Sequence, residues 1–163
     1  MRCPVRVAAF LFLWLAASAG AGAVELSGHV RDIIDGDDIR VCADNECTRI
    51  RFCGIDVPEI GCPGYARARA TLRALVEGRY LRCVQVGSGT VCDGRSKPTH
   101  GDRLIAQCFL EGADVADTLV KSGSACDWTR YSGGHYSRNG NGRECPKNHR
   151  RTCAWMAPNA QRD

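Results

Sequence analysis

Acidic side chains gather in two short segments of this 163-residue chain. The first, residues 35–38, reads Asp-Gly-Asp-Asp, which is typical of a tight turn. The second, residues 51–59, ends with Asp56 and Glu59. Hard divalent cations take several oxygen ligands, which carboxylates and backbone carbonyls on neighbouring turns can supply. Either segment alone is typical of an ordinary turn, but the two together indicate a cation site.

Two arginines accompany these carboxylates. Arg51 begins the second segment, and Arg103 precedes the apolar run Leu-Ile-Ala at residues 104–106. The planar guanidinium fork stays ionised and can bind two phosphate oxygens at once. Attack on a phosphodiester needs an oriented water, a cation on a nonbridging oxygen and donors aimed at the developing charge. Carboxylates and arginines in this order could meet all three needs.

The order of these motifs resembles the thermonuclease (staphylococcal nuclease-like) family over residues 25 to 155, most specifically at residues 51–59. The shared pattern is Asp-Gly-Asp, an arginine, Asp-x-Pro-Glu, a helix, and a second arginine before a strand. The resemblance implies a five-stranded OB-type β-barrel with two or three packed helices, a fold that commonly binds oligonucleotides. It also implies a Ca²⁺-dependent nuclease that cleaves DNA and RNA.

The resemblance further implies a ligand set for calcium. Asp37 and Asp56 are expected to be the carboxylate ligands, with the backbone carbonyl of Val57 as a further ligand. The family usually has a hydroxyl residue where this chain has Asp38. We therefore expect an extra negative charge beside the cation, which would tighten or reshape its binding.

The same resemblance implies three catalytic side chains. Glu59 corresponds to the glutamate that positions or deprotonates the attacking water, and Arg51 and Arg103 correspond to the arginines that hold the phosphate. The usual Tyr-Gly-Arg is Gly-Asp-Arg here, and Asp-Gly-Arg at residues 93–95 offers Arg95 as a competing position. Arg103 is preferred because the apolar run after it matches the family's strand.

Aromatic residues follow the second expected helix. Trp128 and Tyr131 fall where the family places side chains that flank the nucleotide, and a base can stack on such rings without sequence preference. The alternative, that both rings only cover the barrel mouth or the core, stays open. The four histidines form no arrangement with a nucleophile and are assigned no role, since a lone histidine in a loop is usually solvated.

The hydrophobic pattern predicts the elements that position these residues. Period-two alternation indicates strands near residues 25–34, 39–41, 50–55, 80–86 and 104–110. Residues 65–77 are rich in helix formers and are followed by Gly78, and apolar residues recur at helical spacing over residues 113–122. Three strands, a helix, two strands and a helix predict the α+β class.

The N-terminal segment, residues 1–23, has the features of a secretory signal peptide. Two arginines precede an apolar run that is shorter than the roughly 20 residues of a membrane-spanning helix, and small residues ending in Ala23 follow. Cleavage would leave one domain, residues 24–163, as an exported, periplasmic or extracellular monomer without stable membrane association. Without Arg2 and Arg6 the formal net charge falls from +4 to +2, which neither favours nor excludes a nucleic-acid partner.

The chain has eleven cysteines, of which only Cys3 lies in the expected signal peptide. An even number in a small exported domain indicates a disulfide framework, with a Cys42–Cys47 bridge across a hairpin turn as the best single pairing. The alternative is a zinc site at Cys145, His149 and Cys153, whose spacing suits metal ligands. Export favours oxidation over thiolate ligation.

Two other functions compete with the nuclease hypothesis. The first is a catalytically impaired module on the same barrel that binds nucleic acid or protein. The second is a disulfide-rich structural or inhibitory domain whose acidic turn binds calcium for stability. Neither of them needs Glu59 together with two arginines, so the site favours an enzyme.

The cysteine count yields the first prediction. The mature protein is expected to begin at Val24 and to contain no free thiol, because its cysteines can pair completely. Intact mass spectrometry before and after alkylation of native protein measures this. Two or more reactive thiols would contradict the framework and revive the zinc site.

Overall fold

A computed structural model describes residues 24–138 and 142–153 of the chain. The predicted signal peptide, residues 1–23, lies outside the described residues. The described part has the α+β class expected from the order of its elements.

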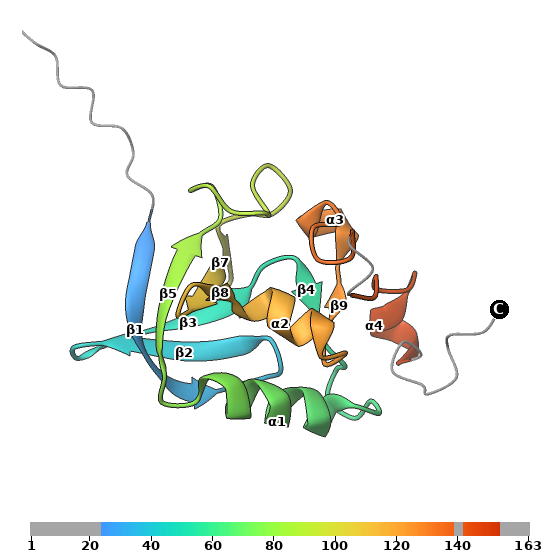
Figure 1. Cartoon of the computed structure of the whole chain (residues 1–163), viewed down its shortest axis with the longest axis horizontal. Coiled ribbons are helices and arrows are strands. Elements are labelled where there is room, and N and C mark those ends of the chain that lie inside the picture. Colours follow the sequence, from blue (N-terminus) through green and yellow to red (C-terminus); the bar gives the residue numbers. More distant parts are fainter. Residues whose placement is uncertain (1–23, 139–141, 154–163) are drawn as a thin grey trace, which may run out of the picture.

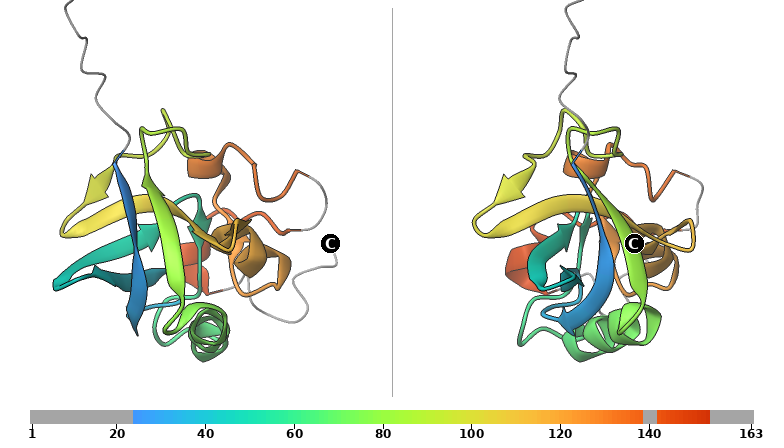
Figure 2. Two further views of the ribbon diagram at one scale, coloured as in Figure 1. Left: turned by 60° about the vertical axis from the view of Figure 1, so that its left-hand side comes forward. Right: turned by 90° about the vertical axis from the view of Figure 1, so that its left-hand side faces the viewer.

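Five strands form a closed barrel (Figure 1, Figure 2). The order around the barrel is β3-β2-β1-β5-β7, in which each neighbouring pair is antiparallel. A parallel pairing of β3 with β7 closes the circle. The strands are β1 (Glu25–Ile33), β2 (Asp38–Ala43), β3 (Glu46–Phe52), β5 (Tyr80–Gln85) and β7 (Arg103–Leu110).

The remaining elements lie around this barrel. In the view of Figure 1, α1 runs beneath the barrel, and α3 and α4 lie on the side away from β1, beyond β4 and β9. Two short strands, β6 and β8, pair with β7, and β4 pairs with β9 in a separate small sheet. These elements are β4 (Ile55–Asp56), α1 (Tyr65–Val76), β6 (Thr99–His100), β8 (Ala113–Asp114), α2 (Val115–Lys121), β9 (Cys126–Asp127), α3 (Thr129–Ser132) and α4 (His149–Thr152).

Apolar side chains at alternate positions of the strands fill the barrel interior. Ile39 and Val41 on β2, and Ile50 and Phe52 on β3, are fully buried. Helix α1 adds Ala68, Leu72 and Val76, whose spacing of four residues places them on one buried face. The strand and helix faces thus share one continuous core.

The third predicted strand is two strands in the structure. β3 ends at Phe52, and β4 begins only at Ile55 and pairs with β9. Gly54 between them has φ of 75°, and a β-carbon there would lie 3.1 Å from the Cys92 sulfur and from the Tyr136 ring. Glycine therefore allows the chain to turn sharply here, and this turn carries Asp56 into the small sheet.

The second long helix also starts later than predicted. Asp114 ends β8 and caps α2, since its carboxylate accepts hydrogen bonds from the backbone nitrogens of Ala116 and Asp117.

Within the described residues, no helix is long and apolar enough to cross a membrane.

Five disulfides staple the structure, and the predicted Cys42–Cys47 pair is among them. The alternative zinc site is not formed, because two of its three ligands are oxidised: Cys145 pairs with Cys126, and Cys153 pairs with Cys62. The other bridges are Cys53–Cys92 and Cys83–Cys108. A framework of this density indicates an oxidising compartment, as expected of an exported protein.

Two of these disulfides form a natural pair for a stability experiment. Cys42–Cys47 and Cys83–Cys108 both join directly opposed residues of antiparallel strands, with Cα atoms 4.0 Å apart. They differ in sequence separation, which is 5 residues in one and 25 in the other. In the chain-entropy treatment, the longer loop contributes about 1.4 kcal/mol more.

Replacing both cysteines of the longer loop by alanine is therefore expected to lower the free energy of unfolding by at least this difference more than replacing Cys42 and Cys47. Cys83 and Cys108 are also buried, which adds a packing loss in the same direction. Urea denaturation of both double variants measures the comparison. Equal losses, or a larger loss in the hairpin variant, would show that loop length does not control this framework.

Candidate functional site

The two acidic segments meet at one end of β3. Asp37 immediately precedes β2, and its carbonyl accepts a hydrogen bond of 2.9 Å from the backbone nitrogen of Phe52. β4 then brings Asp56 to the same place. Asp37 and Asp56 are both buried, and together with Val57 they line a small cleft of about 70 Å³.

Arg51 lies at the centre of this cleft. Its Nη2 is 2.8 Å from Asp37 Oδ2 and 2.7 Å from Asp56 Oδ1. Its Nη1 donates to the carbonyl oxygens of Phe52 and Ile55, at 3.0 and 3.2 Å. One guanidinium thus joins two buried carboxylates from different elements and two backbone groups.

The carboxylates are only partly satisfied by these contacts. Oδ2 of Asp37 and Oδ2 of Asp56 are buried and have no hydrogen bond of good geometry, although Arg51 lies close to the first and His149 close to the second. Burial raises the pKa of Asp37 to about 7 against the opposing effect of Arg51, and burial likewise raises the pKa of Asp56. Additional positive charge would favour their ionised forms.

A divalent cation fits this donor set. Carboxylate oxygens are the ligands that calcium prefers, and Asp37 and Asp56 could hold it with the Val57 carbonyl and oxygens from solvent or substrate. Among the described residues, three potential side-chain ligands cluster tightly only at Cys126, Cys145 and His149, where the two sulfurs form a disulfide. The acidic cleft therefore depends on backbone or solvent oxygens to complete a coordination shell.

Asp38 places its negative charge beside the cleft. Burial chiefly raises the pKa of Asp37, and this charge contributes to the rise. Asp38 is outside the cleft lining, it is buried, and Arg49 binds both of its oxygens, with Nη2 2.8 Å from Oδ2. Arg103 donates to the same carboxylate at 3.2 Å. Arg49 and Arg103 thus both pair with the Asp38 carboxylate, and this carboxylate in turn orients Arg103.

The structure distinguishes the two candidate arginines. Arg103 lines the acidic cleft, whereas Arg95 lines only the larger neighbouring cavity. The parallel pairing of β3 with β7 places Arg103 opposite Arg49. This register carries the Arg103 side chain to the cleft. Nη2 of Arg103 also lies 2.8 Å from His100 Nδ1.

The larger cavity, of about 440 Å³, adjoins the acidic cleft and contains Trp128 and Tyr131 in its lining. The two rings meet edge to face with centroids 4.6 Å apart. Among the described residues that line it, none is acidic, and the lining includes the cations Arg95, Lys97 and Arg130. Aromatic faces among cations suit a ligand that has both rings and negative charge.

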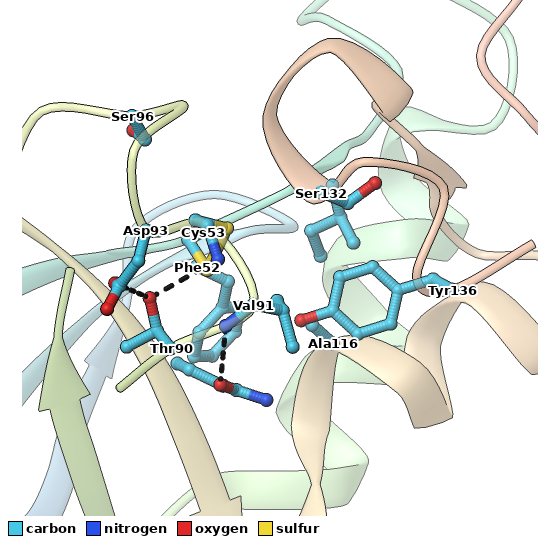
Figure 3. The surroundings of a disulfide bond; sticks show 12 residues. Phe52, Cys53, Thr90, Val91, Asp93, Ser96, Ala116, Ser132 and Tyr136 are labelled. Carbon is cyan, nitrogen blue, oxygen red and sulfur yellow. Dashed lines mark hydrogen bonds between the residues drawn. A yellow bond between two sulfur atoms is a disulfide. The ribbon is translucent and has the colours of Figure 1, made fainter. Parts of the chain in front are cut away.

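The Cys53–Cys92 disulfide supports one wall of this cavity (Figure 3). It ties the end of β3 to the loop that carries Arg95 and Lys97. Asp93 braces the same loop by accepting hydrogen bonds from the Thr90 hydroxyl and from the backbone nitrogen of Gly87. The loop is thus held in place although it has little regular structure.

The sequence analysis missed the contribution of α4. His149 was assigned no role, but it is buried, and its Nε2 lies 2.8 Å from Asp56 Oδ2. The next residue, Arg150, pairs with Glu59 at 2.9 Å. No motif marks this segment, and the one available signal was Cys153, whose bridge to Cys62 brings α4 close to Glu59.

No protein-family model matches this chain, and no curated protein matches it either. The residues of the site and their arrangement therefore indicate the function.

The paired carboxylates predict that a cation stabilises the fold. Millimolar calcium is expected to raise the Tm of the protein, because a ligand that binds only the native state adds about 2.7 kcal/mol at a hundredfold excess over its Kd. Asp37→Asn is expected to remove this calcium-dependent shift. Thermal unfolding with calcium and with chelator measures it.

Asp32→Asn is the matched control, because Asp32 is exposed and pairs with Arg40 on the neighbouring strand. Its calcium shift is expected to equal that of the wild type. An equal shift in the Asp37→Asn variant would place the cation elsewhere.

Proposed function

We propose that this chain is an exported, calcium-dependent nuclease that hydrolyses phosphodiester bonds of DNA and RNA. One observation carries the proposal: two buried, incompletely paired carboxylates, three arginines and Glu59 line one cleft beside a cationic, aromatic cavity. The resemblance to the thermonuclease family implies the same activity.

The carboxylates would hold the cation. Asp37 and Asp56 would bind calcium with the carbonyl of Val57, and the bound ion would offset negative charge on a nonbridging phosphate oxygen. Arg51 keeps both aspartates in place through its contacts of 2.7 and 2.8 Å. The ligands are thus organised before substrate arrives.

Arg51 and Arg103 would bind the scissile phosphate. Both line the cleft and the larger cavity, so their guanidinium groups can reach a phosphate at the boundary between the two. Asp38 and His100 hold Arg103, so that little rearrangement is needed when charge develops on the phosphate.

Glu59 would serve as the general base. Its side chain is 41% exposed at the rim of the cleft, where water has direct access. A carboxylate there can orient a water molecule and accept its proton during attack on phosphorus. In the free protein this carboxylate pairs with Arg150, so substrate binding must release it.

The larger cavity would take the nucleotide next to the scissile bond. A base can stack on Trp128 or Tyr131 regardless of its identity, and the cations around them attract the phosphate backbone. Neither contact requires a particular sugar, which supports action on both DNA and RNA. Periplasm or medium is the proposed location, and the protein is proposed to act as a monomer.

One observation favours the competing binding module. The ion pair between Arg150 and Glu59 occupies the proposed base, and a protein that never released it would bind nucleic acid without cleaving it. Separate measurements of binding and turnover distinguish the two functions.

Glu59→Gln provides this test, because it keeps the shape of the side chain and removes the proton acceptor. Turnover of single-stranded DNA with calcium is expected to fall by about 10²-fold or more, while affinity for a short oligonucleotide changes little. Initial rates and fluorescence anisotropy give the two quantities.

The control is Glu77→Gln, since Glu77 is similarly exposed and pairs with Arg73 on α1. It is expected to leave both quantities unchanged. If wild-type protein binds the oligonucleotide with calcium but cleaves it no faster than the Glu59→Gln variant, the binding module is the correct function.

A further inference from the structure

Helix α4 adds a cation to the site that the proposed mechanism does not use. Arg150 places Nε and Nη2 at 3.0 and 2.9 Å from Glu59 Oε1, and its Nε lies 3.7 Å from Asp56 Oδ2. The segment is far from the two acidic motifs in sequence and has no counterpart among the residues that carry the family resemblance.

The two cavities share few residues. Within the described part of the chain, the residues that line both the acidic cleft and the larger cavity are Arg51, Arg103 and Arg150. Three arginine side chains therefore line the boundary between the cavities. A substrate phosphate must lie at this boundary if its nucleotide enters the larger cavity. Arg150 thus shares its position with the two arginines to which phosphate binding has already been assigned.

Arg150 is the most accessible of the three. Its side chain is 51% exposed, compared with 13% for Arg51 and 22% for Arg103. An ion pair that is half exposed contributes little stability, so a phosphate can replace Glu59 as its partner at small cost. A guanidinium can bind phosphate through two parallel hydrogen bonds.

The surroundings of Arg150 hold it in position for this exchange. Its guanidinium lies over the Trp128 ring, 5.2 Å from the centroid, and the same ring contacts His149 edge to face. The Cys62–Cys153 disulfide ties the end of α4 to the segment after Glu59, where the Cys62 nitrogen donates to the Glu59 carbonyl. The helix is thus anchored on two sides of the arginine.

We infer that Arg150 is a third phosphate-binding arginine, which exchanges Glu59 for a substrate phosphate at the boundary of the two cavities. This inference rests on the proposed function and names a residue of the same site. The exchange has a second consequence: the phosphate that engages Arg150 frees the Glu59 carboxylate to accept a proton from water. Binding of substrate and release of the base are then one event.

The test is the salt dependence of binding, which a purely structural role would leave unchanged. Each phosphate contact on a single strand contributes about 0.7 to the slope of log affinity against log salt concentration. Arg150→Gln is expected to reduce the slope of the wild type by about 0.7 and to weaken binding about tenfold. Arg150→Lys, which keeps the charge, is expected to restore the slope.

The probe is a fluorescent single-stranded DNA oligonucleotide, titrated at several KCl concentrations in the presence of chelator, so that calcium-dependent cleavage does not take place. Arg73→Gln is the matched control, because Arg73 has 48% side-chain exposure and pairs with Glu77 on α1. Its slope is expected to equal that of the wild type. The Tm of each variant, measured alongside, shows that the fold is retained.

Each other outcome overturns the inference. An unchanged slope together with faster turnover in the Arg150→Gln variant would show that Arg150 only masks Glu59. An unchanged slope with unchanged turnover would show that the arginine has no part in the site. If wild-type protein neither binds nor cleaves the oligonucleotide, with or without calcium, the proposed function itself fails and the inference with it.

Discussion

The guanidinium of Arg51 connects three parts of the chain. It lies on β3, contacts Asp37 in the turn before β2, and contacts Asp56 on β4. Burying two carboxylates is costly unless positive charge and hydrogen bonds compensate. Arg51 compensates both carboxylates only in part. His149 and Arg150 also lie near Asp56, but burial still raises the pKa of both aspartates, which is the physical reason to expect a cation. The geometry of the barrel end and the chemistry of the cleft therefore depend on the same side chain.

The closure of the barrel determines what surrounds that arginine. β3 lies between β2 and β7. Arg51 lies opposite Asp38 on β2, and Arg49 lies opposite Arg103 on β7. Asp38 departs from the pattern of the thermonuclease family, which the sequence resembles. Its carboxylate is nevertheless paired, because Arg49 and Arg103 both bind it. The Asp38 carboxylate thus supports Arg103, the arginine that is proposed to bind phosphate.

Two of the disulfides hold segments that lie outside the barrel core. Cys53–Cys92 fixes the loop that forms one wall of the larger cavity, and Cys62–Cys153 fixes α4 beside Glu59. Both segments have little regular structure and few buried apolar side chains of their own. Covalent links can replace a core in such segments, provided that the compartment is oxidising. The walls of the larger cavity and of the cleft therefore depend on disulfides, which persist in an oxidising compartment.

The sequence by itself determined the local elements and the acidic half of the site. The strand alternation, the α1 pattern, the Asp-Gly-Asp turn and the Cys42–Cys47 bridge depend on neighbouring residues, and they were predictable for that reason. Only the tertiary structure decided the split between β3 and β4 and the pairing of Asp38 with two arginines. The sequence already favoured Arg103 over Arg95, and the structure places Arg103 at the cleft. The tertiary structure alone brought His149 and Arg150 to the aspartate and the glutamate. These contacts join residues far apart in the chain, through strand pairing and a disulfide with a sequence separation of 91, and no local pattern encodes them.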